Sequence, residues 1–192
     1  MERSGVYGGE GGGVAFLLSH FYASIEDMSL PSVLIRPAVA EDSMAIGRLG
    51  ALLVRTHHDF DPLRFLAATP QTERGYGSFL GSQLAEPDIV ILVAERDGEV
   101  VGYTYAGVEG TDYMSLRGPA GVLHDIVVDP DHRGQGIGRR LLDATLEALQ
   151  AKGAPRVVLS TAERNESAQR LFARAGFRRT MIEMTRELGA GQ

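Results

Sequence analysis

Residues 123–150 constrain the fold most, because a strand pattern passes there through a glycine-rich loop into a helix pattern. The run at 126–128 is apolar and β-branched, which is typical of a buried strand. A polar loop containing Gly134, Gly136 and Gly138 follows it. The next side chains with helical spacing are Leu141, Leu142, Thr145, Leu146 and Leu149. The segment therefore predicts a strand, a glycine loop and a helix in direct succession.

A helix that begins on glycines is suited to hold a phosphate group. The first backbone N–H groups of a helix have no intrahelical partner, and the helix dipole is positive at that end. Glycine has no Cβ, so an anion can approach these N–H groups closely. We therefore interpret residues 133–139 as a phosphate-binding loop.

Two common phosphate loops do not fit this spacing. A nucleoside-triphosphate loop requires a lysine directly after its last glycine, where this sequence has Arg139. A dinucleotide loop requires a third glycine at this same position and an acidic residue about 20 positions later. The segment after the helix, 152–155, has no acidic residue. Nucleotide hydrolysis and hydride transfer are therefore disfavoured.

A third loop type agrees better, because Arg133, Gly136 and Gly138 form an R-x-x-G-x-G pattern. This pattern resembles the pyrophosphate loop of the GNAT N-acetyltransferases. A second segment, 165–177, resembles the N-x-x-A-x-x-x-Y-x-x-x-G-F signature of the same family. Two motifs in strand–helix–strand–helix order are stronger evidence than one glycine loop. The resemblance implies an acyltransferase that uses acetyl-CoA as co-substrate.

The periodicity and the resemblance together predict an α/β (α+β) fold of the GNAT type. We expect a mixed, mostly antiparallel sheet of six to seven strands with helices on both faces. The resemblance implies that the strand at about 122–128 splays from the strand at 156–160. Further strands are expected near 33–38, 89–94, 100–108 and 178–186, and helices near 45–56, 73–84, 137–149 and 166–175. An Asp-Gly turn at 97–98 joins two of these strands.

Length and composition limit the class of protein. The 192 residues suit one domain with a substantial core. A net charge of −6 offers no basic surface, so we expect no nucleic-acid partner. The chain has no cysteine, which excludes a thiol nucleophile and a Cys-based zinc site, and we expect no metal. No apolar run reaches the ~18 residues of a membrane span, so a cytoplasmic protein with no membrane partner is expected.

The first 30 residues differ from the remainder. Six glycines lie among the first 13 residues, which favours a flexible extension or an upstream translation start, with Met28 near the true beginning. A short helix over 14–28 that packs on a partner or over the active site is the alternative. We therefore expect an N-terminal extension at 1–30 and a single acetyltransferase domain at 31–188.

The resemblance implies that the strand before the loop binds the pantetheine arm through its backbone, as an added strand would. An amide near Ile126 or Val127 would then face the thioester oxygen. Arg133 either contacts a phosphate or only closes the loop. Asn165 either caps its helix or contacts the cofactor. The residues expected to bind acetyl-CoA are Ile126, Val127, Val128, Arg133, Gly134, Gln135, Gly136, Ile137, Gly138, Arg139, Asn165 and Phe172.

His124 and Asp125 are the candidates for the general base, although each also has a purely structural interpretation. His124 stands where several resembling enzymes carry a glutamate, and the pKa of free histidine, near 6.5, suits proton transfer. On a regular strand Asp125 would point to the opposite face. Phe172 replaces the tyrosine that protonates the leaving thiolate in many family members. Loss of such an acid costs ~10²–10⁴-fold in rate, so we expect modest activity or another proton source.

The acceptor site is expected beside the segment that joins the first two helices, because this segment flanks the acceptor in resembling proteins. An acidic or aromatic pocket for a cationic amine would use His57, His58, Asp59, Asp61, Tyr103 and Tyr105. The alternative is an ordinary helix end followed by an Asp-Pro turn. The acceptor, a small molecule or a peptide, is not identified by the sequence. The oligomeric state also stays open, with a homodimer as one alternative.

These features predict transfer of an acetyl group from acetyl-CoA to a primary amine. The amine would attack directly in a ternary complex, because no cysteine is available to carry an acyl intermediate. The alternative is an acyl-CoA-binding sensor or partner module with little or no catalysis. Release of the CoA thiol in the presence of amines distinguishes these two functions.

Overall fold

The computed structural model describes residues 33–188. Its elements in chain order are β1 (Leu34–Pro37), the short 3-10 helix η1 (Ala40–Asp42), α2 (Ser43–Phe60), α3 (Thr72–Gln83), β2 (Ile89–Arg96), β3 (Glu99–Glu109), β4 (Ala120–Val128), η2 (Pro130–His132), α4 (Ile137–Ala151), β5 (Val157–Leu159) and α5 (Glu166–Arg174). The extension expected at 1–30 lies outside the described residues. No helix among residues 33–188 is long and apolar enough to cross a membrane.

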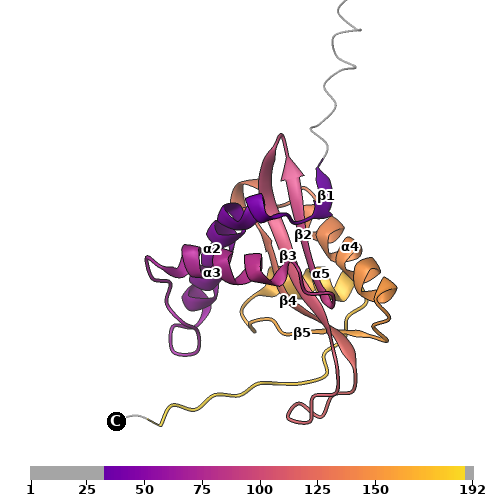
Figure 1. Ribbon diagram of the computed structural model, residues 1–192. Helices are drawn as coiled ribbons and strands as arrows, with labels where there is room; N and C mark the ends of the chain where they lie inside the picture. The colour runs from indigo at the N-terminus through magenta and orange to yellow at the C-terminus, as the bar shows by residue number, and fades with distance from the viewer. Residues whose placement is uncertain (1–32, 189–192) are drawn as a thin grey trace, which may run out of the picture. The chain divides into compact units, whose positions relative to one another are not determined.

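The five strands form one sheet in the order β1-β2-β3-β4-β5 (Figure 1). β1 to β4 pair antiparallel, and only β5 lies parallel to its neighbour. The turn between β2 and β3 has positive φ at both central residues, 52° at Asp97 and 82° at Gly98. This conformation matches the twist of a tight hairpin, so the expected Asp-Gly turn is confirmed.

The expected number of six to seven strands is wrong for the described residues. The missing strand is the one expected at 178–186, which is exposed and has no strand assignment. Its apolar residues Met181, Ile182 and Met184 are compatible with a strand, but a strand also requires a neighbour for its backbone hydrogen bonds. No such neighbour pairs with it within residues 33–188.

Helices cover both faces of the sheet, as expected (Figure 1). On one face α2 and α3 contribute Ile46, Leu49 and Leu80 to a core with Val93 and Val127. On the other face the core contains side chains from α4, α5 and the strands: Leu142, Leu149, Phe172, Val90, Ala106 and Leu123. Burial of such side chains supplies the main driving force for folding. β4 thus contributes to both cores.

Two glycines let α2 and α3 approach closely. A Cβ on Gly47 would lie 2.3 Å from the Glu73 carbonyl oxygen, and a Cβ on Gly50 would lie 2.2 Å from the ring of Tyr76. Neither distance leaves room for a methyl group. Gly50 therefore provides the space that the Tyr76 ring occupies, and so it fixes where the Tyr76 hydroxyl points.

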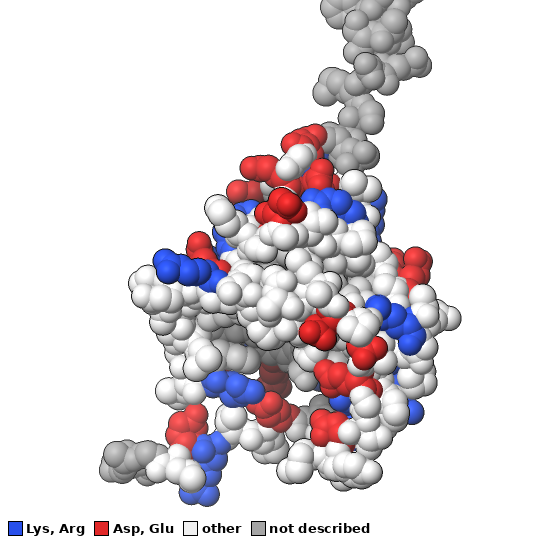
Figure 2. All heavy atoms as spheres, viewed as in Figure 1, with Lys and Arg blue, Asp and Glu red and all other residues white. Residues whose placement is uncertain are grey.

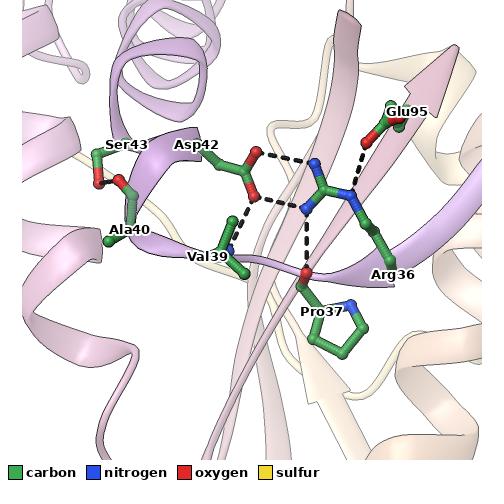
Figure 3. Close-up of polar contacts among 7 residues, drawn as sticks. All are labelled: Arg36, Pro37, Val39, Ala40, Asp42, Ser43 and Glu95. Atoms are coloured by element: carbon green, nitrogen blue, oxygen red, sulfur yellow. Dashed lines mark hydrogen bonds and ion pairs between the residues drawn. The ribbon is translucent and has the colours of Figure 1, made fainter. Parts of the chain in front are cut away.

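An ion-pair cluster fixes the start of the fold (Figure 3). Arg36 of β1 donates to both carboxylate oxygens of Asp42, at 2.7 and 2.9 Å, and to Glu95 of β2 at 2.7 Å. Asp42 also accepts from the Val39 amide at 2.8 Å. The Arg36 guanidinium keeps the pKa of Asp42 below its usual value. The cluster ties the edge strand to the beginning of α2.

Candidate functional site

β4 and β5 separate in the middle of β4. Residues 121–123 pair with residues 157–159, and no pairing with β5 continues beyond Leu123. On its other side β4 stays paired with β3 as far as Val128, opposite Gly102. The backbone of 124–128 that faces away from β3 therefore has no strand partner among the described residues. A ligand with amide groups can add there as a strand would. The splay that the family resemblance implied is confirmed.

The glycine loop follows this separation directly. Gly134 and Gly136 have φ of 77° and 80°, which lie in the left-handed region that favours glycine. Gly136 is the N-cap of α4 and supplies no side chain to cap it. The first intrahelical hydrogen bond runs from the Arg140 amide to the Gly136 carbonyl at 3.1 Å. The amides of residues 137–139 therefore have no intrahelical acceptor and suit an anion.

Both arginines of the loop contact protein groups. The Arg133 Nε donates to the Val128 carbonyl at 2.9 Å, which joins the loop to the end of β4. This contact agrees with the loop-closing alternative for Arg133. Arg139 Nε pairs with Asp143 one turn later on α4, at 2.7 Å. The backbone amides at the start of α4, by contrast, have no intrahelical acceptor and are directly available to a diphosphate.

The remaining residues expected to bind the cofactor have structural contacts. Gln135 lies at the tip of the loop and accepts from Arg96 of β2. The Asn165 Oδ1 accepts from the Ala168 amide at 3.2 Å, so it caps α5. Phe172 is buried and its ring packs edge-on against Phe177, with 5.8 Å between the centroids. Phe172 has no hydroxyl, so it holds α5 to the core and cannot supply a proton.

A β-bulge places His124 and Asp125. Asp125 pairs with Tyr105 and Leu123 pairs with Ala106, so His124 has no partner across the strand. Alternation along β4 is broken at this point. Leu123 belongs to the α4–α5 core, whereas Asp125 contacts Tyr76 of α3 and Tyr103 of the core below α2 and α3. The opposite orientation of His124 and Asp125 expected for a regular strand therefore does not apply.

Asp125 lies at the centre of a buried polar cluster. Its side chain accepts from the Tyr103 hydroxyl at 2.9 Å and the Tyr76 hydroxyl at 3.1 Å, both at Oδ2. Burial raises the pKa of Asp125, and the two hydroxyls oppose this shift without cancelling it. Burial and the nearby carboxylate raise the pKa of Tyr76 and Tyr103 as well. Both tyrosines therefore stay protonated and act as donors.

His124 lies beside this cluster and is partly open to solvent. Its Nε2 is 3.1 Å from Glu109 Oε1, and 36% of its side chain is exposed. The imidazole stacks on the Tyr105 ring, with centroids 4.9 Å apart and planes inclined by 26°. The Phe79 ring of α3 meets Tyr105 edge-on at 5.9 Å. Glu109 fixes one ring nitrogen, which leaves Nδ1 to face another group.

The histidines and the aspartates of residues 57–61, at the end of α2, make different contacts. His57 and His58 each bind a backbone carbonyl through Nδ1, at 2.9 and 3.0 Å. His57 is near enough to Asp125 for its charge to lower that pKa. Asp61 accepts from two amides of the following turn, and Asp59 is exposed. Within residues 33–188 no hydrogen bond joins Asp59 or Asp61 to the Asp125 cluster or to His124, so the structure does not bring these two aspartates into the site.

Three residues of this site were missed by sequence reasoning. Tyr76 binds Asp125, Glu109 binds His124, and Phe79 contacts Tyr105. The spacing of Gly47 and Gly50 is a signal for close helix packing that would have drawn attention to α3. Glu109 gave no signal, because its position opposite β4 depends on the register of the hairpin.

The face shown in Figure 2 is hollowed below α3, and acidic side chains gather near the β3–β4 hairpin. Glu109 and Asp112 are acidic residues of that hairpin, with 40% and 42% of their side chains exposed. Among the described residues no three His, Asp or Glu side chains are grouped in a way that could hold a metal ion. The site thus combines aromatic rings with carboxylates, which favours a cationic ligand.

Comparisons with known proteins agree with this geometry. A profile described as the acetyltransferase (GNAT) family matches residues 53–177. Mycothiol acetyltransferase of Thermobispora bispora is 38% identical over 97 residues, which make up 48% of this chain and 31% of that protein. The chain thus spans under a third of the length of that relative.

Solved structures show the same fold. A variant of the BH1408 protein from Bacillus halodurans has a TM-score of 0.69 and 20% identity, over 81% of this chain and 99% of the other. An aminoglycoside N-acetyltransferase in complex with CoA has a TM-score of 0.61 and 18% identity, over 83% and 97%. The matched profile covers more than half of the 192 residues, and the chain belongs to the GNAT family of acetyltransferases.

Proposed function

We propose that this protein is an N-acetyltransferase that moves the acetyl group of acetyl-CoA to a primary amine. The observation that carries the proposal is the separation of β4 from β5 directly before the glycine loop. The pantetheine arm would add to the open side of residues 126–128. The diphosphate would bind the amides at the start of α4. The acetyltransferase domain would comprise residues 31–188.

The reaction is a direct transfer in a ternary complex. The amine nitrogen attacks the thioester carbonyl carbon, the C–S bond breaks, and the sulfur leaves with the electron pair as a thiolate. A free amide of β4 near Ile126 would stabilise the negative charge that develops on the carbonyl oxygen. An ammonium group first loses one proton to become the neutral amine that attacks. The nitrogen of the tetrahedral adduct then loses a second proton to a base, and the thiolate can take a proton from solvent.

We infer that His124 is the base and that Asp125 positions it. His124 is accessible, and Glu109 Oε1, 3.1 Å from its Nε2, orients the ring and leaves Nδ1 to face the acceptor. Asp125 instead uses one oxygen to accept from two tyrosine hydroxyls, which links α3, β3 and β4. That link holds the bulge on which His124 sits. Asp125 therefore acts through the backbone of its neighbour.

We infer that the acceptor carries positive charge. The Tyr105 ring and the Glu109 carboxylate contact His124, and the Phe79 ring packs against Tyr105. A cation is attracted both to aromatic faces and to carboxylates. Small molecules and peptides with a primary ammonium group both meet this requirement.

A panel of amines tests the proposed activity. Purified protein, acetyl-CoA and one amine per reaction are monitored for free CoA thiol, and mass spectrometry checks for the acetylated amine. We expect release with cationic primary amines and none with their acetylated forms. Tight binding of acetyl-CoA with no thiol release from any amine would instead favour the acyl-CoA-binding module.

Substitution at Gly136 tests the cofactor site. Gly136→Val forces a branched residue into positive φ and adds bulk at the start of α4, so we expect CoA affinity to fall at least ~100-fold. Gly98→Val is a matched control, because Gly98 also has φ near 80° and open space at its Cβ position but lies in the β2–β3 turn. Equal CoA affinity of the two variants, measured by calorimetry, would refute the assignment.

A further inference from the structure

A small closed turn ends the hairpin between β3 and β4. Asp112 and Arg117 form an isolated β-bridge, in which each amide donates to the carbonyl of the other residue at 2.8 Å. Inside this turn the Asp112 carboxylate accepts from the Met114 amide at 2.9 Å and from the Ser115 hydroxyl at 2.6 Å. These hydrogen bonds fix the backbone at Arg117, and they therefore fix the direction in which its side chain leaves the hairpin.

The Arg117 side chain lies against the end of β3 and is mostly enclosed, with 14% of it exposed. Its Nη2 donates to Glu109 Oε2 at 2.7 Å, whereas the Asp112 carboxylate is 4.0 Å away. The Arg117 Nη1 is buried and has no hydrogen-bond partner within residues 33–188. An enclosed charge requires a partner of opposite charge. Glu109 therefore supplies the one short ion pair that Arg117 makes within this part of the chain.

Glu109 uses its two carboxylate oxygens for two different side chains. Oε2 accepts from Arg117, and Oε1 lies 3.1 Å from His124 Nε2. A partly exposed glutamate side chain has several rotamers open to it, and a charge-assisted hydrogen bond selects among them. The contact with Arg117 thus selects the rotamer that reaches the imidazole. Arg117, Glu109 and His124 form a continuous polar chain from the hairpin to the bulge of β4.

The charges around His124 are mostly negative. Glu109 of β3 contacts the imidazole, and Asp125 beside it on β4 is near enough to interact with its charge. Tyr105, which stacks on the ring, has a raised pKa because of burial and so stays neutral. Carboxylates favour the protonated imidazole, which cannot accept a proton from an amine. The Arg117 guanidinium opposes this effect, because it compensates the charge of the carboxylate that touches the ring.

We propose that Arg117 is a positioning residue, which holds Glu109 against His124 and lowers the pH at which the imidazole becomes free to accept a proton. The contacts that carry this role join groups of the protein alone. Its effect on the rate rests on the proposed function, in which His124 is the base. Arg117 acts through Glu109 and makes no contact with His124 itself.

Nuclear magnetic resonance titration of the His124 imidazole in the full chain tests this role, with His124→Ala to identify the signal. Arg117→Gln removes the charge and should move the titration midpoint upward by about half a unit to one unit of pH, because the carboxylate is then uncompensated. Arg117→Lys keeps the charge and should restore at least half of that change. A midpoint that Arg117→Gln leaves in place would overturn the proposal.

A control variant on the same hairpin separates charge from loosening of the turn. Ser115→Ala removes the 2.6 Å hydrogen bond to Asp112 and leaves Arg117 and Glu109 in place, so the midpoint should stay at its native value. A change as large as that of Arg117→Gln would mean that the turn as a whole, rather than the guanidinium, controls His124. That result would also refute the role of Arg117.

A double-mutant cycle shows whether the effect passes through Glu109. In the Glu109→Gln background, Arg117→Gln should move the midpoint by less than half as much as in the native chain, because the carboxylate that it compensates is gone. Equal changes in the two backgrounds would show that Arg117 acts on His124 directly. The proposal would then be wrong.

Initial rates of CoA thiol release distinguish this inference from the proposed function. In Arg117→Gln the acidic limb of the pH–rate profile should move upward together with the titration midpoint, and KM for acetyl-CoA should not change. A midpoint that moves while the rate profile stays in place would support the chain from Arg117 to His124. The same result would exclude His124 as the base.

Discussion

Removal of the Tyr103 hydroxyl would expose the energetics of the buried cluster around Asp125. Tyr103→Phe deletes a 2.9 Å hydrogen bond to the carboxylate of Asp125, a residue that is only 9% exposed. The ring stays in the core, so the lost hydrogen bond is the main change. A hydrogen bond to a charged group contributes about 1.5–3 kcal/mol, and one between neutral groups contributes about 1 kcal/mol. The cost of the substitution should therefore depend on whether Asp125 carries charge.

The sign of the pH dependence follows from the raised pKa of Asp125. The folded protein binds the Asp125 proton more tightly than the unfolded chain, whose value is near 3.8. Stability contributed by this group therefore falls as the pH rises from about 4 through the raised pKa. The Tyr103 hydroxyl favours the ionised form, so its removal raises that pKa further. We expect Tyr103→Phe to cost about 2 kcal/mol at pH 8 and about 1 kcal/mol at pH 4.

Urea unfolding followed by far-ultraviolet circular dichroism from pH 4 to pH 8 measures this cost. Tyr105→Phe is the matched control, because its hydroxyl has no hydrogen-bond partner among residues 33–188 and it lies two residues along the same strand. Asp125→Asn provides the second control. In that background Tyr103→Phe should cost about 1 kcal/mol at every pH, because no charge remains.

Two results would refute this reasoning. A cost of Tyr103→Phe that does not change with pH would mean that Asp125 does not ionise within the range. If the cost of Tyr103→Phe still changes with pH in the Asp125→Asn background, another group causes the pH dependence. Either result would remove the basis for treating Asp125 as a buried acid that organises the site.

Three further predictions concern the base, the acceptor and the N-terminal ion pairs. His124→Ala should lower kcat by ~10²–10⁴-fold and flatten the pH–rate profile near neutrality. Initial rates measured across pH check this, and an unchanged profile would exclude His124 as the base. Glu109→Gln should raise KM for a cationic amine more than Asp59→Asn does, with KM for acetyl-CoA unchanged in both; equal effects would place the acceptor elsewhere. Asp42→Asn should cost about 2 kcal/mol at pH 7, because it leaves Arg36 without its main partner. Since the pKa of Asp42 is lowered, this difference should shrink as the pH falls below about 4 in urea titrations.

The part of the site that is proposed to bind acetyl-CoA was predictable because its motifs are continuous in the sequence. The run before Asp129, the glycines and the helix beyond them follow one another in sequence, and each has its own pattern. Gly134 and Gly136 have positive φ, a conformation that favours glycine, so the glycines themselves indicate a turn at this point. The splay from β5 came from the family resemblance instead, because no local pattern marks where two strands separate.

The part of the site around His124 and Asp125 was less predictable because it depends on contacts between segments that are distant in the sequence. The bulge at His124 arises from the register between β3 and β4, which hydrophobic alternation alone did not reveal. Tyr76 reaches Asp125 from a helix 49 residues earlier. The strand expected at 178–186 was wrong for a related reason, since a strand requires a neighbouring strand and none pairs with this segment within residues 33–188.

The extra residue in β4 also governs how related chains can be aligned. Side chains on the two sides of His124 follow opposite alternation, so deleting one residue there would turn one half of the strand over. In an alignment of homologues, the residues of β4 before His124 should therefore be matched by their distance from the β3–β4 hairpin. The residues after His124 should be matched by their distance from the glycine loop. A one-residue gap at this point thus changes which side chains face the site, whereas the same gap in a loop changes only the length of the loop.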